Sequence, residues 1–165
     1  MPSTGCTSSR REWATDKTDL KERKQMKLII ASDIHGSALC CRKLLEACDR
    51  EEADRILLLG DILYHGPRND LPEGYAPKEV IAALNAWKDE ILCVRGNCEA
   101  EVDQMVLKFP VMADYAVLFI DGYRIYATHG HVYHPDRLPP LQPGISSSTA
   151  TPMCRHGKNA GRSSA

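Results

Sequence analysis

The chain has 165 residues, the length of one ordinary domain, which is enough to bury a hydrophobic core. Its 21 Lys and Arg residues nearly balance 22 Asp and Glu residues, so no net field draws it to nucleic acid or to an anionic membrane. The seven cysteines lack paired C-x-x-C spacing and no run of about 18 apolar residues occurs, so we expect a soluble cytoplasmic protein without a membrane partner.

Residues 1–25 are polar and aperiodic, which predicts a disordered extension. The stretch "KERKQ" before Met26 can be encoded by a purine-rich run that resembles a bacterial ribosome-binding site. We therefore hypothesise that translation starts at Met26, and N-terminal sequencing of the native protein would test this.

From Met26 onward, continuous apolar runs alternate with segments of helical periodicity. The predicted strands lie at 27–32, 54–61 and 91–97, and the predicted helices within 33–53, 76–90 and 99–109. Strands without apolar alternation that are separated by helices indicate a parallel sheet, and hence an α/β fold. Residues 115–131 predict two further strands around Asp121 and Gly122, which form a hairpin signal.

Polar side chains follow the strands where each strand ends. They are Asp33, His35, Asp61, Asn97, His129 and His131. In open α/β sheets ligands gather outside the carboxyl ends of the strands, so these segments can converge. Carboxylate, imidazole and amide oxygen donors suit Mn, Mg, Fe, Ni or Zn, and a second Asp could bridge two ions with its two oxygens. The sequence therefore predicts a two-metal hydrolytic site for phosphoryl transfer.

Each of these signals also has a plainer interpretation. A single D-x-H after a strand is usually a turn with a helix N-cap, G-N is commonly a turn, and one histidine is usually a satisfied or exposed side chain. The metal interpretation is favoured because every piece falls at a predicted strand end. The remaining cysteines of this region are better explained as small core residues: Cys40, Cys41, Cys48 and Cys93.

Four stretches together resemble a known family: "MKLIIASDIHGS", "LLLGDILYHGPRNDLPEGYAP", "VRGNCEAEVDQM" and "THGHVYHPDRLPPL". They are similar to the bacterial YfcE-type phosphodiesterases of the calcineurin-like metallophosphoesterase superfamily, over about Met26 to Leu141. The resemblance implies a sandwich of two β-sheets flanked by helices, a dinuclear metal site at one edge, and a small phosphodiester substrate.

The resemblance also implies roles for individual residues. Asp33 and His35 would hold one metal, Asp61 would bridge, and Asn97 and His129 would hold the second; His131 is less favoured, though spacing does not exclude it. The residues expected to act on the substrate are Asn97, Cys98, His65 and Arg68. Two divalent ions are expected per site, with Mn favoured over Mg, Ni, Fe and Zn.

Cys98 departs from the wider superfamily, where a histidine usually follows the motif Asn. A thiol is a poor substitute for an imidazole as a general acid, so the site should favour phosphodiesters with good leaving groups. A phosphomonoesterase or nucleotide hydrolase is a weaker alternative for that reason. A non-catalytic protein-binding scaffold is a second alternative, but every expected ligand position before the tail carries a residue type that binds metal. A homo-oligomer is left open.

The superfamily's closing "GHTH" motif is absent from the chain. The tail "GISSSTATPMCR" can be encoded so that one G inserted after the Gly144 codon changes the translation to "GDIFIYGHTHVP". We therefore expect a metallophosphoesterase domain over 26–144, with its second sheet incomplete, followed by an out-of-frame disordered tail over 145–165. The activity of the chain as written is expected to be impaired.

Overall fold

The computed structural model describes residues 25–120, 123–134 and 137. The predictions for the N-terminal extension (apart from its last residue) and for the tail over 145–165 lie outside the described residues. Within the described residues, the longest helix has 14 residues, and none is long and apolar enough to cross a bilayer.

The centre of the fold is a three-stranded parallel sheet in the order β1-β2-β3. Its strands are β1 (Leu28–Ala31), β2 (Arg55–Leu58) and β3 (Ile91–Cys93). Ile30 pairs with Leu57, which in turn pairs with Leu92. The continuous apolar runs of the sequence thus form a parallel sheet, as predicted.

A helix follows each of these strands: α1 (Ala38–Glu51) lies between β1 and β2, α2 (Pro77–Ala86) between β2 and β3, and α3 (Glu101–Val106) after β3. Helix α1 begins at Ser37, whose hydroxyl accepts the N–H of Cys40. Helix α3 is shorter than the predicted segment 99–109. Pro110 disfavours helical backbone at Phe109, and the side chain of Gln104 bonds to the Phe109 carbonyl instead.

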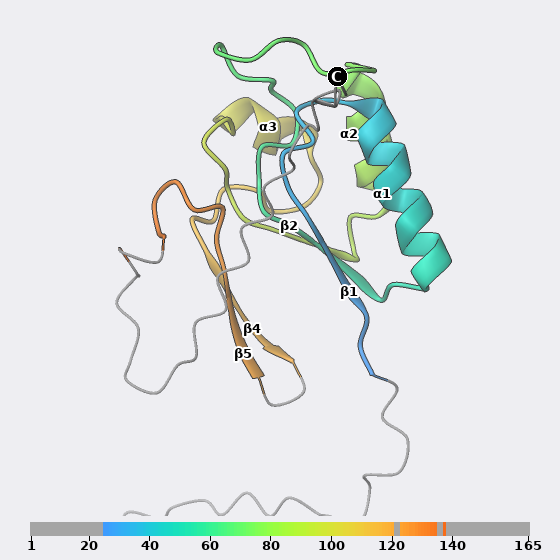
Figure 1. The fold of residues 1–165 in the computed structure, drawn as a ribbon, viewed down its shortest axis with the longest axis vertical. Helices are drawn as coiled ribbons and strands as arrows, with labels where there is room; N and C mark the ends of the chain where they lie inside the picture. Colours follow the sequence, from blue (N-terminus) through green and yellow to red (C-terminus); the bar gives the residue numbers. More distant parts are fainter. Residues whose placement is uncertain (1–24, 121–122, 135–136, 138–165) are drawn as a thin grey trace, which may run out of the picture.

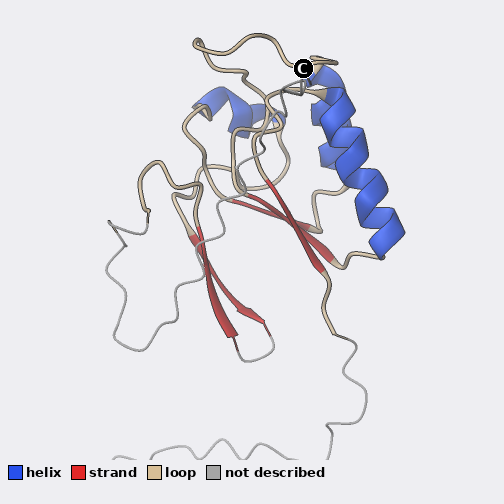
Figure 2. Ribbon diagram, viewed as in Figure 1, coloured by secondary structure: helices blue, strands red, loops and turns tan. Residues whose placement is uncertain are grey.

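Two antiparallel strands, β4 (Ala116–Ile120) and β5 (Tyr123–Ala127), form a second sheet. The strand pair is confirmed, while Asp121 and Gly122 of the predicted turn lie outside the described residues. The hairpin lies on the opposite side of the parallel sheet from α1 (Figures 1 and 2).

Strand β2 is buried on both faces, which explains why its sequence shows no polar alternation. Ile56 and Leu58 belong to the core beneath the helices. Leu57 and Leu59 pack instead in a smaller core with Ala127 of β5. The sheet therefore has helices over one face and the hairpin over the other, and its carboxyl edge is left for the polar loops.

Candidate metal centre

The polar residues predicted at the strand ends come together at this carboxyl edge. His35 Nε2 lies 3.4 Å from Asp33 Oδ1 and 3.7 Å from Asp61 Oδ2. His129 Nε2 lies 3.7 Å from the same Asp61 oxygen and 3.0 Å from Asn97 Oδ1. Residues that are up to 96 positions apart in the chain thus form one cluster, with Asp61 between two imidazoles.

The backbone at this cluster adopts an uncommon conformation. Asp33, His35 and Asp61 have φ angles of 58°, 48° and 57°, in the left-handed region. The conformation costs an L-residue about 1–2 kcal/mol and is concentrated at functional sites. Hydrogen bonds between the loop after β1 and the loop after β2 hold this backbone conformation. The N–H of Asp33 donates to Gly60 O at 3.1 Å, and the N–H of His35 donates to Asp61 O at 2.8 Å.

Backbone carbonyls set the tautomers of both imidazoles. His35 Nδ1 lies 2.7 Å from Tyr64 O, and His129 Nδ1 lies 2.7 Å from Leu59 O. A carbonyl can only accept, so Nδ1 must carry the proton and donate it in both residues. In the neutral imidazole, the lone pair of Nε2 then faces the acidic side chains of the cluster, which is the arrangement found in metal-ligating histidines.

A divalent cation fits this donor set. With His129 neutral, its Nε2 and Asn97 Oδ1 are two acceptors facing each other at 3.0 Å, with a carboxylate oxygen of Asp61 beside them. Within the described part of the chain, two groups bring a ligand atom of each member within 4.8 Å of the others. They are Asp33, Asp61 and His129, and His35, Asp61 and Cys98. Several acceptor atoms that converge in this way favour a bound cation.

Asp61 is the most buried member of the cluster, with a residue exposure of 2 %. Its Oδ1 accepts the backbone N–H of Cys98 at 2.9 Å, while Oδ2 faces both imidazoles. The sequence suggested bridging through both carboxylate oxygens. In the structure Oδ2 alone faces both histidines, because Oδ1 is engaged by the loop after β3.

Glu99 was not among the predicted site residues, yet it joins the two central loops. Its carboxylate accepts the N–H groups of Asp61 at 2.9 Å, Ile62 at 2.7 Å and Gly96 at 2.5 Å. Burial raises the pKa of Glu99, and these three backbone donors counteract that rise. The only sequence signal was an acidic residue next to the "GNC" turn, whose partners lie 37 and 38 residues away.

Glycine is required where the loops after β2 and β3 touch. A Cβ on Gly96 would overlap the carboxylate and the backbone nitrogen of Asp61, and a Cβ on Gly60 would overlap the backbone of Gly96. Two backbone segments can approach this closely only where glycine, which has no side chain, lies at the contact. The close approach brings Asp61 and Asn97 to the same site.

Cys98 lies beside the cluster, with its thiol accepting a hydrogen bond from Asn97 Nδ2 at 3.2 Å. Burial, followed by the Asp61 carboxylate, raises the pKa of this thiol to about 12. Without a cation at the site it is therefore a neutral thiol rather than a nucleophilic thiolate.

The other two residues expected to act on the substrate lie in the loop that passes over Cys98. A Cβ on Gly66 of this loop would lie 3.4 Å from the Cys98 sulfur. His65 is half-buried with its ring edge-to-face against Tyr64 and Tyr75, and Arg68 is exposed. His65 does not belong to the ligand groups found among the described residues.

His131 stacks edge-to-face on His129, with ring centroids 5.3 Å apart. Burial, and then the neighbouring His129, lower its pKa. His129 takes part in a ligand group of the described residues and His131 does not, so His129 remains the histidine that we propose as a ligand.

Comparison with known proteins identifies the fold and its family. The calcineurin-like phosphoesterase superfamily domain matches residues 26–156. The chain belongs to this family and has the metallophosphoesterase fold, with a three-stranded parallel sheet and a second small sheet. The family implies divalent metal ions, for which the cluster provides the donors.

Relatives of known name are phosphodiesterases. Phosphodiesterase YfcE of Escherichia coli strain K12, and the same enzyme of E. coli O157:H7, are 47% identical over 116 residues, which is 70% of this chain and 63% of the relative. A solved structure of YfcE, a phosphoesterase from E. coli, matches with a TM-score of 0.68 at 47% identity, covering 71% of this chain and 64% of that chain. The chain therefore spans somewhat less than two thirds of these relatives.

Proposed function

We propose that this chain is a metal-dependent phosphodiesterase that acts on a small phosphodiester. The observation that carries the proposal is the position of Asp61, whose buried Oδ2 lies 3.7 Å from an imidazole nitrogen on either side. One carboxylate oxygen between two histidines is suited to contact two cations at once. The names of the E. coli relatives support the same activity.

The proposed ligands divide into two sets around Asp61. Asp33 and His35, from the loop after β1, would hold one ion, and Asn97 and His129 the other, with Asp61 shared between them. When bound, divalent ions neutralise charge on the phosphoryl oxygens and lower the pKa of water. The residues of the chain supply position: Tyr64 O and Leu59 O orient the imidazoles, and Glu99 holds the two central loops together.

Mn²⁺ is the ion that we propose for catalysis. Three of the five proposed ligands, Asp33, Asp61 and Asn97, offer oxygen, the donor that suits Mn²⁺, while His35 and His129 offer nitrogen. The five cysteines of the described region are all free thiols, which supports the proposed reducing, cytoplasmic setting.

The substrate preference rests on Cys98. Its thiol follows Asn97, at the position where a histidine could protonate a leaving group, and a thiol is a weaker proton donor than an imidazole near neutral pH. We therefore propose that diesters with good leaving groups, such as aryl phosphodiesters, are hydrolysed faster than alkyl monoesters.

The test is hydrolysis of bis(4-nitrophenyl) phosphate by the full chain after metal removal and addition of Mn²⁺. We expect activity only with the metal, and near-complete loss in Asp61→Ala, whereas the exposed Asp49→Asn should behave as the unmodified chain. Activity that survives chelation and desalting would contradict the proposal.

A further inference from the structure

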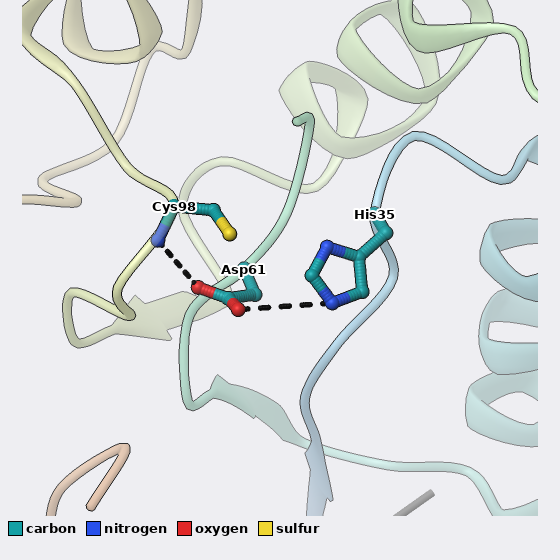
Figure 3. Close-up of side chains that lie close together, drawn as sticks. All are labelled: His35, Asp61 and Cys98. Carbon is teal, nitrogen blue, oxygen red and sulfur yellow. Dashed lines mark hydrogen bonds and ion pairs between the residues drawn. The ribbon is translucent and has the colours of Figure 1, made fainter. Parts of the chain in front are cut away.

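Cys98 places a sulfur atom next to two of the proposed metal ligands. A ligand atom of His35, one of Asp61 and the sulfur of Cys98 all lie within 4.8 Å of one another. Figure 3 shows the Cys98 side chain pointing toward the space between Asp61 and His35. The three residues come from three different loops at the carboxyl edge of the sheet.

The position of this sulfur is fixed on two sides. The backbone N–H of Cys98 donates to Asp61 Oδ1 at 2.9 Å, so the cysteine and the carboxylate are held as a unit. The side-chain amide of Asn97 donates to the sulfur at 3.2 Å. Because Nδ1 faces Tyr64 O at 2.7 Å, a neutral His35 presents the lone pair of Nε2 to the site. The group is thus preorganised without needing movement of the backbone.

The surroundings of the sulfur favour a cation. A carboxylate oxygen of Asp61 lies within 4.8 Å of the sulfur, and Glu99 and Asp33 also act on it electrostatically. Together with the histidine nitrogen, the cluster offers one sulfur, one nitrogen and carboxylate oxygens. Soft thiolate ligands select Zn²⁺ and similar ions, while Mn²⁺ prefers oxygen.

We propose that His35, Asp61 and Cys98 form a site for a thiophilic divalent ion, Zn²⁺ or Cd²⁺, which competes with Mn²⁺ for the centre. The inference rests on the proposed metal centre, because it shares His35 and Asp61 with it. On binding, the Cys98 S–H bond breaks, the proton passes to solvent, and a sulfur–metal bond forms. The residue that replaces the usual histidine thereby makes the centre selective between hard and soft ions.

The first experiment detects the sulfur–metal bond directly. Cd²⁺ is titrated into the metal-free full chain, and the ultraviolet charge-transfer absorption of the cadmium–thiolate bond is recorded along with the amount of bound metal. We expect a saturating band in the unmodified chain and in Cys40→Ser, whose thiol lies outside the ligand group, and loss of that band in Cys98→Ser. An equal band in Cys98→Ser, or bound Cd²⁺ without a band in the unmodified chain, would overturn the inference.

A second experiment measures selectivity and does not depend on catalysis. Mn²⁺ release is followed by electron paramagnetic resonance while Zn²⁺ is added. Cys98→Ser should need at least about tenfold more Zn²⁺ for the same release, since a ligand or its close support changes affinity by about 10–100-fold. An unchanged Zn²⁺ requirement contradicts the proposal. Because neither measurement uses turnover, a chain that binds Cd²⁺ through Cys98 but hydrolyses no diester would refute the proposed function alone.

Discussion

The carboxylate of Glu99 accepts the backbone N–H of Asp61 at 2.9 Å, and through this bond the loop after β2 is tied to the loop after β3. The same Oε2 atom also accepts the N–H of Gly96 at 2.5 Å. Asp61 is the proposed shared ligand and Asn97 follows Gly96, so one side chain sets the spacing between the shared ligand and the loop that carries Asn97. A carboxylate suits this task because it has two oxygens and only accepts hydrogen bonds.

Replacing Glu99 by Gln should weaken metal binding at the proposed centre. The amide nitrogen of Gln is a donor, so it would face one of the three backbone N–H groups that the carboxylate now accepts. Hydrogen bonds to a charged group contribute about 1.5–3 kcal/mol. We expect Mn²⁺ affinity, measured by calorimetry, to fall about 10–100-fold.

The matched control is Glu101→Gln, at an exposed acidic residue two positions further along the chain. It should leave Mn²⁺ affinity unchanged. If Glu99→Gln were to bind Mn²⁺ as tightly as the unmodified chain, the positioning role of Glu99 would be refuted.

Gly96→Ala should separate the two central loops. The added methyl group would overlap the carboxylate and the backbone nitrogen of Asp61, neither of which can move without breaking its hydrogen bonds to Cys98 or Glu99. Overpacking of this kind costs about 1–3 kcal/mol. Thermal unfolding should show a lower midpoint, and Mn²⁺ binding should be largely lost; a variant with unaltered midpoint and affinity would show that the loops tolerate separation.

The sequence carried enough information to place the main elements and the polar residues that gather at the edge of the sheet. The apolar runs before Asp33, Asp61 and Asn97 are local signals of buried parallel strands, and the carboxyl ends of parallel strands share one edge. Convergence of these residues therefore followed from topology alone. The position of His129 depends in addition on the packing of the second sheet against the first. The smaller core, in which Ala127 of β5 packs with Leu57 and Leu59, holds the two sheets together.

The role of Glu99 could not be predicted because it depends on a separation of a few ångströms between two loops. A residue pattern records periodicity, but it does not record that the Asp61 and Gly96 N–H groups point at one carboxylate. The left-handed backbone at Asp33, His35 and Asp61 was likewise hidden, since none of them is a glycine. Glycine is the residue that usually signals such a conformation in a sequence.

Cys98→His should change the substrate preference of the proposed enzyme. An imidazole beside Asn97 can donate a proton near neutral pH, and a thiol is a weaker general acid there. We expect the ratio of monoesterase to diesterase activity to rise by about tenfold or more, within the range that general acid catalysis supplies. Both rates are to be measured with 4-nitrophenyl phosphate and its diester at the same Mn²⁺ concentration. An unchanged ratio would mean that the leaving group is protonated elsewhere.

The last prediction concerns the segment after Gly144, for which we propose that one lost base has changed the translation. Inserting one G after the Gly144 codon restores "GDIFIYGHTHVP", whose two histidines would add imidazole ligands, whereas the tail as written offers Cys154 and His156 in a Gly- and Ser-rich context. Reacting groups held about 1 Å out of place cost on the order of a hundredfold in rate. At equal concentration with Mn²⁺, the repaired chain should therefore hydrolyse an aryl phosphodiester at least about a hundredfold faster than the 165-residue chain.

The control for this prediction is a repaired chain with both new histidines changed to alanine, and it should return to the lower rate. Comparable rates for the repaired and unrepaired chains would show that the added histidines play no part in the centre and that the lost-base proposal is wrong.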